Sequence, residues 1–184
     1  MNAGIIASRY AKAFLKYVQE EGTGKTAYSQ ACILVSVMNE VPQMKSYIES
    51  PSDISVDRKI ELLSAALEAV LDSSLARLLQ MVTDHRRVEY FPRILLSFIE
   101  QYRQENNIKV GRLVTASPQD GLCERLEQIF HDKTGAEVHL QEKISPDLIG
   151  GFVFELEGLR LDASVESHLA RIRRQLVEKN NRIV

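Results

Sequence analysis

This 184-residue sequence contains no tryptophan and only two cysteines, and no apolar run approaches the roughly 18 residues that a membrane-spanning helix needs. Cys32 and Cys123 lack a neighbouring cysteine or a histidine pair, so we expect no zinc site at either position. We expect both to be buried free thiols. The four histidines, which are His85, His131, His139 and His168, are too dispersed to form a metal pair on one helix. No metal or cofactor is therefore expected.

The sequence also has no excess of charge of one sign. The net charge is −2, and it divides evenly between the two halves of the chain. Residues 1–105 carry 12 basic and 13 acidic side chains, and residues 106–184 carry 11 and 12. Neither half is the basic domain that nucleic-acid binding usually requires. A nucleic-acid-binding adaptor nevertheless remains the alternative hypothesis, because the last predicted helix is basic and follows a small predicted sheet.

The first 105 residues have the apolar periodicity of helices in six successive segments. The first segment shows it at Ile6, Tyr10, Ala13, Phe14, Tyr17 and Val18. We expect Gly22 and Gly24 to end this helix. We also expect Ser55 to cap the fourth helix and Val70 to complete its core face. Short connections favour antiparallel neighbours, so the pattern predicts an all-α six-helix bundle over residues 1–105.

The pattern changes after the polar segment 104–107. Residues 109–116 alternate with period two, as a half-buried strand does, and residues 122–130 return to helical spacing. Three further strands are predicted at 138–144, 152–156 and 159–161, the last two as a hairpin. A final helix over 165–177 begins at Ser164, with Asp162 accepting backbone N–H bonds at its start. The sequence therefore predicts an α+β protein, with a small α+β domain over residues 106–184.

Two features of the last 40 residues suggest a surface rather than a reaction centre. Gly150 and Gly151 are consecutive, which predicts a backbone with an unusual φ or a close approach to another segment. Arg171, Arg173 and Arg174 cluster on the final helix, either as a solvated face or as a docking surface for acidic helices. The opposite face, which we expect to pack, carries Val165, Leu169, Ile172 and Leu176.

One fragment resembles part of a nucleotide site. Gly24-Lys25-Thr26 matches the end of a phosphate-binding loop, but the motif needs a glycine where Gln19 stands, and it must follow a strand rather than a helix. We interpret the fragment as a flexible turn between helices. It is the only basis for a third hypothesis, an unrecognised enzyme, and the sequence predicts no catalytic site.

Three motifs together resemble those of a known family. They are I-A-S-R-Y-A-K-A-F at 6–14, L-I-G-G-F-V-F-E-L at 148–156 and L-D-A-S-V at 161–165, the last followed by a helix of leucines and arginines. The chain resembles the delta subunit of F-type ATP synthases, which is called OSCP in mitochondria, over its whole length. The resemblance implies a non-catalytic stator subunit that links the catalytic head to the peripheral stalk. Such a subunit supports rotational ATP synthesis driven by the proton-motive force.

The resemblance also implies two partners. In the family, the N-terminal domain binds the N-terminal helix of an alpha subunit, and the C-terminal domain binds the end of the b-subunit stalk. Carried over by position, the alpha-binding groove lies between the first and fifth helices, at Ile6, Tyr10, Ala13, Phe14, Leu78, Met81 and Val82. Tyr10 and Ala13 are the strongest candidates, because a small residue beside an aromatic one makes a slot for a helix.

The stalk surface is assigned to Gly150, Gly151, Arg171 and Arg174. The N-terminal sequence has neither a secretion signal nor a transit peptide. We therefore expect a peripheral protein on the cytoplasmic face of a bacterial cell membrane, held there only through its complex, although a processed organellar chain would have the same N-terminal features.

Overall fold

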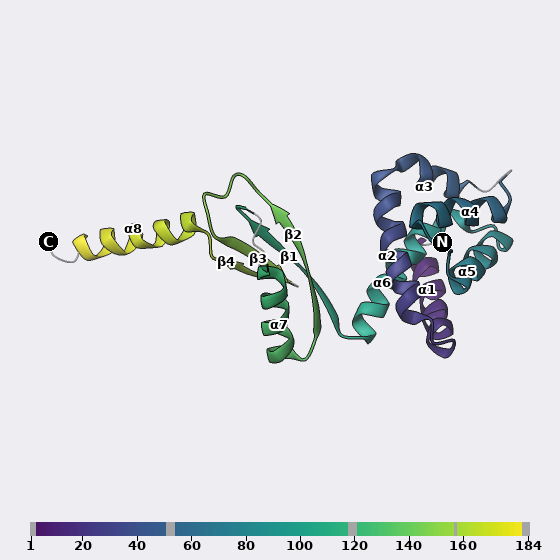
Figure 1. The fold of residues 1–184 in the computed structure, drawn as a ribbon, viewed down its shortest axis with the longest axis horizontal. Coiled ribbons are helices and arrows are strands. Elements are labelled where there is room, and N and C mark those ends of the chain that lie inside the picture. The colour runs from purple at the N-terminus through teal and green to yellow at the C-terminus, as the bar shows by residue number, and fades with distance from the viewer. Residues whose placement is uncertain (1–2, 51–53, 118–120, 157, 182–184) are drawn as a thin grey trace. The chain divides into compact units, whose positions relative to one another are not determined.

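The computed structural model describes residues 3–50, 54–117, 121–156 and 158–181, although it does not describe the side chains of 176–181. The chain divides into two compact units, Met1–Asn106 and Asn107–Val184. Figure 1 shows helices alone in the first unit and helices with a sheet in the second. The predicted α+β class and the helical N-terminal part are confirmed.

Within the described residues, the first unit contains six α-helices around one apolar core. They are α1 (Ala3–Glu20), α2 (Gly24–Glu40), α3 (Pro42–Glu49), α4 (Val56–Leu67), α5 (Ser73–Asp84) and α6 (Phe91–Glu105), with a 3-10 turn at Val88–Tyr90. Helix α6 packs against both α1 and α2. The ring of Phe98 on α6 is fully buried, and its centroid lies 4.8 Å from that of Phe14 on α1. This aromatic contact packs the first helix of the unit, α1, against its last helix, α6.

The turn between α1 and α2 corrects the prediction for one of its glycines. Gly22 follows α1 with a φ of +71°, which explains why glycine suits the end of that helix. Gly24, in contrast, is the first residue of α2. A Cβ at this position would lie 3.2 Å from Cε2 of Tyr102 on α6. Gly24 therefore allows α2 to start close against α6, and it does not end α1.

Helix α4 begins as predicted but ends earlier. Ser55 caps it, with its Oγ accepting from the backbone N–H of Arg58 at 3.4 Å. The helix stops at Leu67, because Glu68 adopts a left-handed conformation with a φ of +50°. Val70 lies beyond this break and is 86% exposed, so its predicted place in the core was wrong.

A lysine is buried between α3 and α4. The side chain of Lys59 is only 1% exposed, and its Nζ donates to the carbonyl oxygens of Ile48 and Ser50, at 3.0 and 2.7 Å. The ammonium group thus binds carbonyls at the C-terminal end of α3, where the helix dipole favours a cation. Burial lowers the pKa of this lysine. Its sequence context gives no sign of this role.

The second unit is built on a four-stranded mixed sheet in the order β2-β1-β3-β4. Its elements are β1 (Ile108–Thr115), α7 (Leu122–Thr134), β2 (Glu137–Ile144), β3 (Phe152–Leu156), β4 (Leu159–Asp162) and α8 (Val165–Asn181). Strands β1 and β2 are parallel and are joined through α7, which packs on the sheet beside β2 (Figure 1). Strand β3 pairs antiparallel with β1 and with β4, so the predicted hairpin of the last two strands is confirmed.

The core of this unit lies between α7 and the sheet. Leu113 on β1 is fully buried there, and the ring of Phe130 on α7 stacks on that of Phe154 on β3, with centroids 4.6 Å apart. At the far edge, Leu159 and Leu161 on β4 are exposed, although they pair with buried residues of β3. Helix α7 packs at the β2 side of the sheet, which explains why it leaves the β4 edge uncovered.

The two consecutive glycines lie where the chain enters β3. Gly151 has a φ of +80°, and a Cβ on it would overlap the carbonyl oxygen of Ala163 and lie 3.0 Å from the Cα of Ser164. The carbonyl oxygen of Gly150 accepts from the backbone N–H of Val165 at 3.0 Å. Both the unusual φ and the close approach predicted from the sequence are therefore present. They bring the start of β3 against the connection between β4 and α8.

Two side chains cap the start of α8 as predicted. Ser164 Oγ accepts from the backbone N–H of Ser167 at 3.2 Å. The Asp162 carboxylate accepts from the Ser164 backbone N–H at 3.0 Å and from the Ser167 hydroxyl at 2.8 Å. These hydrogen bonds, first of all those from Ser164, lower the pKa of Asp162 to about 2. The stabilisation is present above the ordinary pKa of 3.8 and is lost as the pH falls through about 2.

The packing face predicted for α8 is wrong for this chain by itself. Val165, Leu169 and Ile172 are all exposed, the middle one by 56%. The side chain of Leu176, the fourth predicted member, lies outside the described residues. Periodicity correctly finds an apolar stripe here, but no part of the chain that the structure describes covers it.

Candidate partner-binding site

A mainly apolar pocket lies between α1 and α5 in the helical unit. Its volume is about 190 Å³. The lining residues are Tyr10, Ala13, Phe14 and Tyr17 from α1 and Ser74, Arg77, Leu78 and Met81 from α5. Small-molecule sites usually enclose roughly 300–1,000 Å³, so this hollow is better matched to one or two inserted side chains. The geometry therefore favours a protein partner over a small ligand.

The helical repeat explains how the pocket forms. Tyr10, Ala13, Phe14 and Tyr17 are spaced at i, i+3, i+4 and i+7, so they share one face of α1. Phe14 is buried and forms the floor, while Ala13 is exposed on the rim between the two half-buried tyrosines. A small residue between two large ones leaves the depression.

Five of the seven residues assigned to the groove line this pocket, namely Tyr10, Ala13, Phe14, Leu78 and Met81. The other two do not. Ile6 is buried and lies outside the lining, and Val82 is fully buried in the core. Met81 and Val82 are adjacent in the sequence, yet Met81 is 45% exposed. Of the seven assigned residues, only these five are placed in the wall of the pocket.

Sequence reasoning missed three lining residues, which are Tyr17, Ser74 and Arg77. Tyr17 appeared only as a member of the apolar stripe on the first helix. Its spacing of seven residues from Tyr10 was a usable signal, because that interval repeats the same helical face. The sequence gives no signal that would bring Ser74 or Arg77 to α1.

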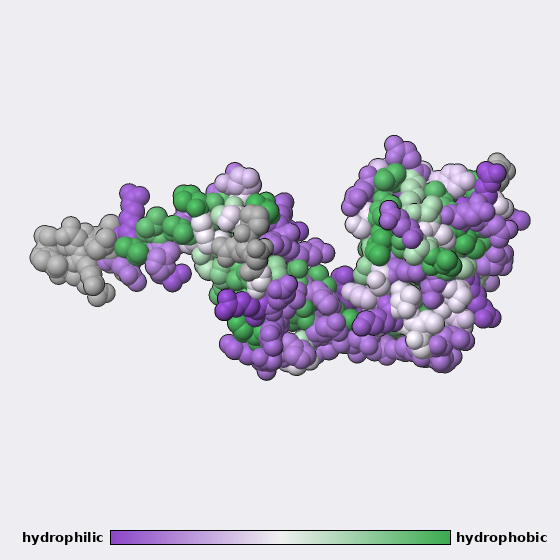
Figure 2. All heavy atoms as spheres, viewed as in Figure 1, coloured by the Kyte–Doolittle hydropathy of each residue, from purple (hydrophilic) through white to green (hydrophobic). Residues whose placement is uncertain are grey.

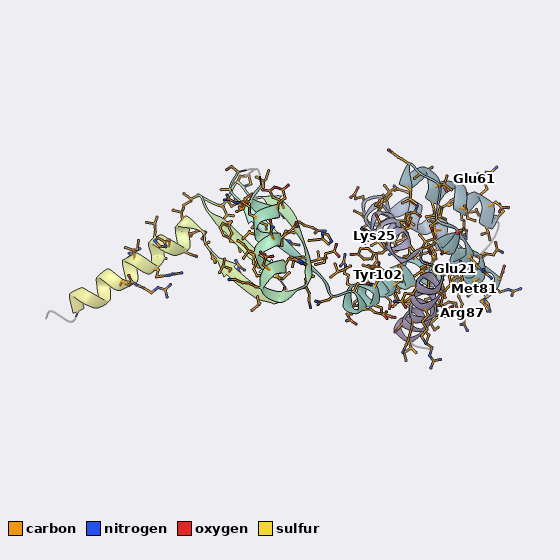
Figure 3. All side chains as sticks on the ribbon, turned by 60° about the horizontal axis from the view of Figure 1, so that its bottom comes forward. Glu21, Lys25, Glu61, Met81, Arg87 and Tyr102 are labelled. Carbon is orange, nitrogen blue, oxygen red and sulfur yellow. The ribbon has the colours of Figure 1, made fainter. Side chains whose placement is uncertain are left out.

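Each tyrosine of the pocket is held by an arginine. The Arg77 guanidinium donates to the Tyr17 hydroxyl at 3.2 Å, and its carbon lies 5.3 Å from the ring centroid. Arg87, just after α5, donates to the Tyr10 hydroxyl at 3.2 Å and lies 5.8 Å from that ring. Figure 3 labels Arg87 and Met81, which project from neighbouring parts of the helical unit. The apolar pocket therefore has a cationic group at each end.

The elements around the pocket are basic, although the whole chain carries −2. Helix α1 has three basic residues and one acidic residue, and segment 73–87 likewise has three and one, which makes a net charge of +4. Among the ion pairs seen in the described residues, none joins Arg77 or Arg87 to a carboxylate. Of these six basic residues only Arg77 lines the pocket, so the attraction of anionic groups to this face depends on Arg77 and on Arg87 beside Tyr10.

A second candidate surface lies at the start of α8. A hollow of about 450 Å³ is lined by Leu161, Asp162, Ala163, Ser164, Val165, His168, Leu169 and Arg171. Apolar residues are visible on the described part of α8 in Figure 2. Arg171 and Arg174, both assigned to the stalk surface, are exposed on this helix. Gly150 and Gly151 are half-buried, and their contacts within the chain assign them a shaping role.

The remaining candidates from the sequence offer no site. Cys32 and Cys123 are free thiols, but they are half-buried rather than buried. Burial and nearby carboxylates raise the pKa of the Cys123 thiol. In the part of the chain that the structure describes, no three His, Cys, Asp or Glu side chains gather as metal ligands would. The same residues include no helix that is both long and apolar enough to span a membrane.

Comparison with known proteins gives a consistent result. The family model described as "ATP synthase delta (OSCP) subunit" matches residues 6–176. The ATP synthase subunit delta of Phocaeicola vulgatus is 35% identical over 186 aligned positions, which cover 100% of both chains. That of Bacteroides thetaiotaomicron is 33% identical over 187 positions, with the same coverage.

The fold has a relative among solved structures. A chain of the Toxoplasma gondii mitochondrial ATP synthase hexamer aligns with a TM-score of 0.61 at 19% identity, covering 93% of this chain and 97% of that one. At this identity the likeness concerns the fold. Neither the family match nor these relatives supports the nucleic-acid-binding alternative.

Proposed function

Because this chain belongs to the ATP synthase delta (OSCP) subunit family, we propose that its helical unit binds the alpha subunit of the catalytic head through the groove between α1 and α5. The chain is a non-catalytic subunit of the F-type ATP synthase, and its role is that of a stator. The observation that carries the proposal is the apolar pocket between Tyr10 and Tyr17. In this proposal the unit acts as a rigid six-helix bundle that presents one groove.

The proposed occupant is the N-terminal helix of an alpha subunit, lying along α1 with an apolar side chain inserted over Ala13. Burying four side chains in the groove contributes roughly 6–10 kcal/mol before other terms. Association opposes this with about 4–15 kcal/mol of lost freedom and ordering. One groove alone therefore holds weakly, and a stator gains from a second attachment that raises the effective concentration of the first.

We expect Ala13→Trp to weaken the binding of this helix at least about thirty-fold, because an indole at this exposed position fills the slot. The measurement is an isothermal titration of the full chain with a peptide that covers the N-terminal helix of the alpha subunit from the same ATP synthase. Circular dichroism of both proteins checks that the variant is folded.

Gln19→Trp is the matched control, because Gln19 is exposed on the same helix but does not line the pocket. It should bind the peptide as tightly as the wild type. Equal affinities of the wild type and Ala13→Trp, or no binding by the wild type, would show that the groove is not the alpha-binding site.

For the second unit, we propose that α8 binds the C-terminal region of the b-subunit stalk. Its exposed stripe at Val165, Leu169 and Ile172 has the spacing of a helix that packs on another helix. Arg171 and Arg174 lie on the same helix and can pair with acidic groups of a stalk. Such a partner would supply the cover that the apolar stripe lacks in the described chain.

Leu169→Asp should weaken stalk binding about tenfold or more, because it places a charge in the middle of the stripe. The measurement is a pull-down or titration of the full chain with the C-terminal segment of the b subunit. Ile129→Asp is the control, since Ile129 is an exposed apolar residue of α7 in the same unit. A larger loss of affinity with Ile129→Asp than with Leu169→Asp would indicate that the stalk contacts α7 rather than α8.

In the assembled enzyme, we propose that this subunit lies at the cytoplasmic face of a bacterial cell membrane and reaches it only through its partners. The bacterial origin of its curated relatives supports this location. Fractionation of cells that lack the b subunit should release the chain from the membrane fraction.

A further inference from the structure

We propose that Arg77 and Arg87 make the groove selective for an acidic helix, one that carries two carboxylates about two turns apart with apolar residues between them. This inference rests on the proposed function, because it concerns the chemistry of the helix that the groove receives. It adds two residues to the binding surface, of which Arg87 does not line the apolar pocket itself.

The spacing follows from the two tyrosines. Tyr10 and Tyr17 are seven residues apart on α1, so they lie on one face and about 10.5 Å apart along the axis, at about 1.5 Å per residue. Arg87 is bound to the first hydroxyl and Arg77 to the second. Although the arginines come from distant parts of the sequence, α1 thereby sets their separation.

Both guanidinium groups keep donors for a partner. A guanidinium has five N–H donors, and each of these arginines uses one for its tyrosine hydroxyl. The ion pairs found in the described residues leave both without a carboxylate. The tyrosine contacts also restrict the long side chains before a partner arrives. Less conformational entropy is then lost when a carboxylate binds, and a bidentate geometry is accessible.

The local field favours the same partner. The two segments that form the groove carry a net +4, while the chain as a whole carries −2. At the groove itself, Arg77 and Arg87 are the groups that attract an acidic helix and repel a basic one, which gives specificity as well as a faster encounter. None of the ion pairs found in the described residues neutralises this positive charge.

The pocket between the arginines decides which kind of anion fits. Its floor is made by Phe14 and Leu78, both of which are almost completely buried. A phosphate backbone would leave this apolar floor uncovered, whereas an amphipathic helix covers it with aliphatic side chains. On a helix that runs along α1, carboxylates at positions i and i+7 would face the arginines. Apolar residues at i+3 and i+4 would face the floor.

The test is a titration of the full chain with the alpha-subunit N-terminal peptide, comparing the wild type with Arg77→Gln, Arg87→Gln and the double variant. We expect each single variant to bind about three- to tenfold more weakly and the double variant at least tenfold more weakly. The losses should shrink when the salt concentration is raised from about 0.05 to 0.5 M, because rim charges are screened. Peptides with glutamine at the facing acidic positions should bind wild type and double variant alike.

Arg58→Gln is the charge-matched control, because Arg58 is exposed on α4 and lies outside the pocket lining. It should leave the affinity unchanged. Ala13→Trp could abolish binding while both arginine variants bind as tightly as the wild type at low salt. In that case the groove is the binding site, but the proposed selectivity for an acidic helix is wrong. If the wild type does not bind the peptide at all, the proposed function is wrong and this inference falls with it.

Discussion

Gly151→Ala is expected to lower the free energy of unfolding of the second unit by about 2–6 kcal/mol. The φ of +80° at this position is unfavourable for any residue with a Cβ, which accounts for roughly 1–3 kcal/mol. The added methyl group would also overlap the carbonyl oxygen of Ala163. This neighbour is backbone and cannot turn aside as a flexible side chain would. Relieving such an overlap typically costs a further 1–3 kcal/mol.

Gly158→Ala separates these two contributions. Gly158 has a φ of +85°, but a Cβ there would meet no heavy atom within 4 Å, so only the conformational penalty remains. Hydrogen exchange at the amides of β3 and β4 measures the loss within this unit, independently of the helical unit. Equal losses in the two variants would show that the close approach to Ala163 contributes nothing to stability.

The same substitution tests the shaping role of the glycine pair. Gly150 accepts a hydrogen bond from Val165, the first residue of α8, so displacing this segment also displaces the start of that helix. We expect Gly151→Ala to weaken stalk binding even when the variant is folded, although neither glycine would touch the stalk. Normal stalk binding by a folded variant would contradict this interpretation.

Lys59→Met is expected to destabilise the helical unit by about 2–4 kcal/mol. Methionine fills similar space but cannot donate, so the carbonyl oxygens of Ile48 and Ser50 lose the charged partner that now binds them. Because the lysine is only 1% exposed, water cannot easily replace it. Chemical unfolding followed by circular dichroism measures the loss. Lys45→Met is the control, because Lys45 is exposed and makes only a 4.0 Å ion pair with Glu49.

The pH dependence of this difference has a definite sign. Burial lowers the pKa of Lys59 in the folded chain below its ordinary value of 10.5. Between the lowered pKa and 10.5, the unfolded chain binds more protons at this site than the folded chain, so the contribution of Lys59 to stability rises with pH. The gap between the wild type and Lys59→Met should therefore widen as the pH approaches about 10. A gap that narrows would mean that the buried amine keeps its proton.

Features that depend on neighbours in the sequence were predicted well. Ser55 and Ser164 were identified as helix caps, because a cap bonds to an N–H only three residues away. The strand at 152–156 was also found with its bounds, since a short run of aromatic and β-branched residues is a local signal. Val70 was misplaced because its apolar spacing continued the pattern of α4 past the left-handed break at Glu68. The residue type at position 68, a glutamate, does not indicate such a break.

Features that depend on distant residues were missed. Arg77 reaches Tyr17 across 60 positions of the sequence, and Arg87 reaches Tyr10 across 77. The buried contacts of Lys59 likewise join two separate helices. Solvent-exposed and buried lysines or arginines look the same in a sequence, because their charge is visible there but their surroundings are not.

By itself, the sequence determined the α+β class, the apolar face of each helix, the glycine pair and, through three motifs, the family. The tertiary structure decided which parts of those apolar faces remain open. Met81 is on the rim and Val82 is in the core, although one peptide bond separates them. The stripe of α8 is exposed, although its helical spacing predicts a packing face. Helical periodicity shows that a face is apolar, but only the arrangement of the other elements shows whether the chain covers it or leaves it for a partner.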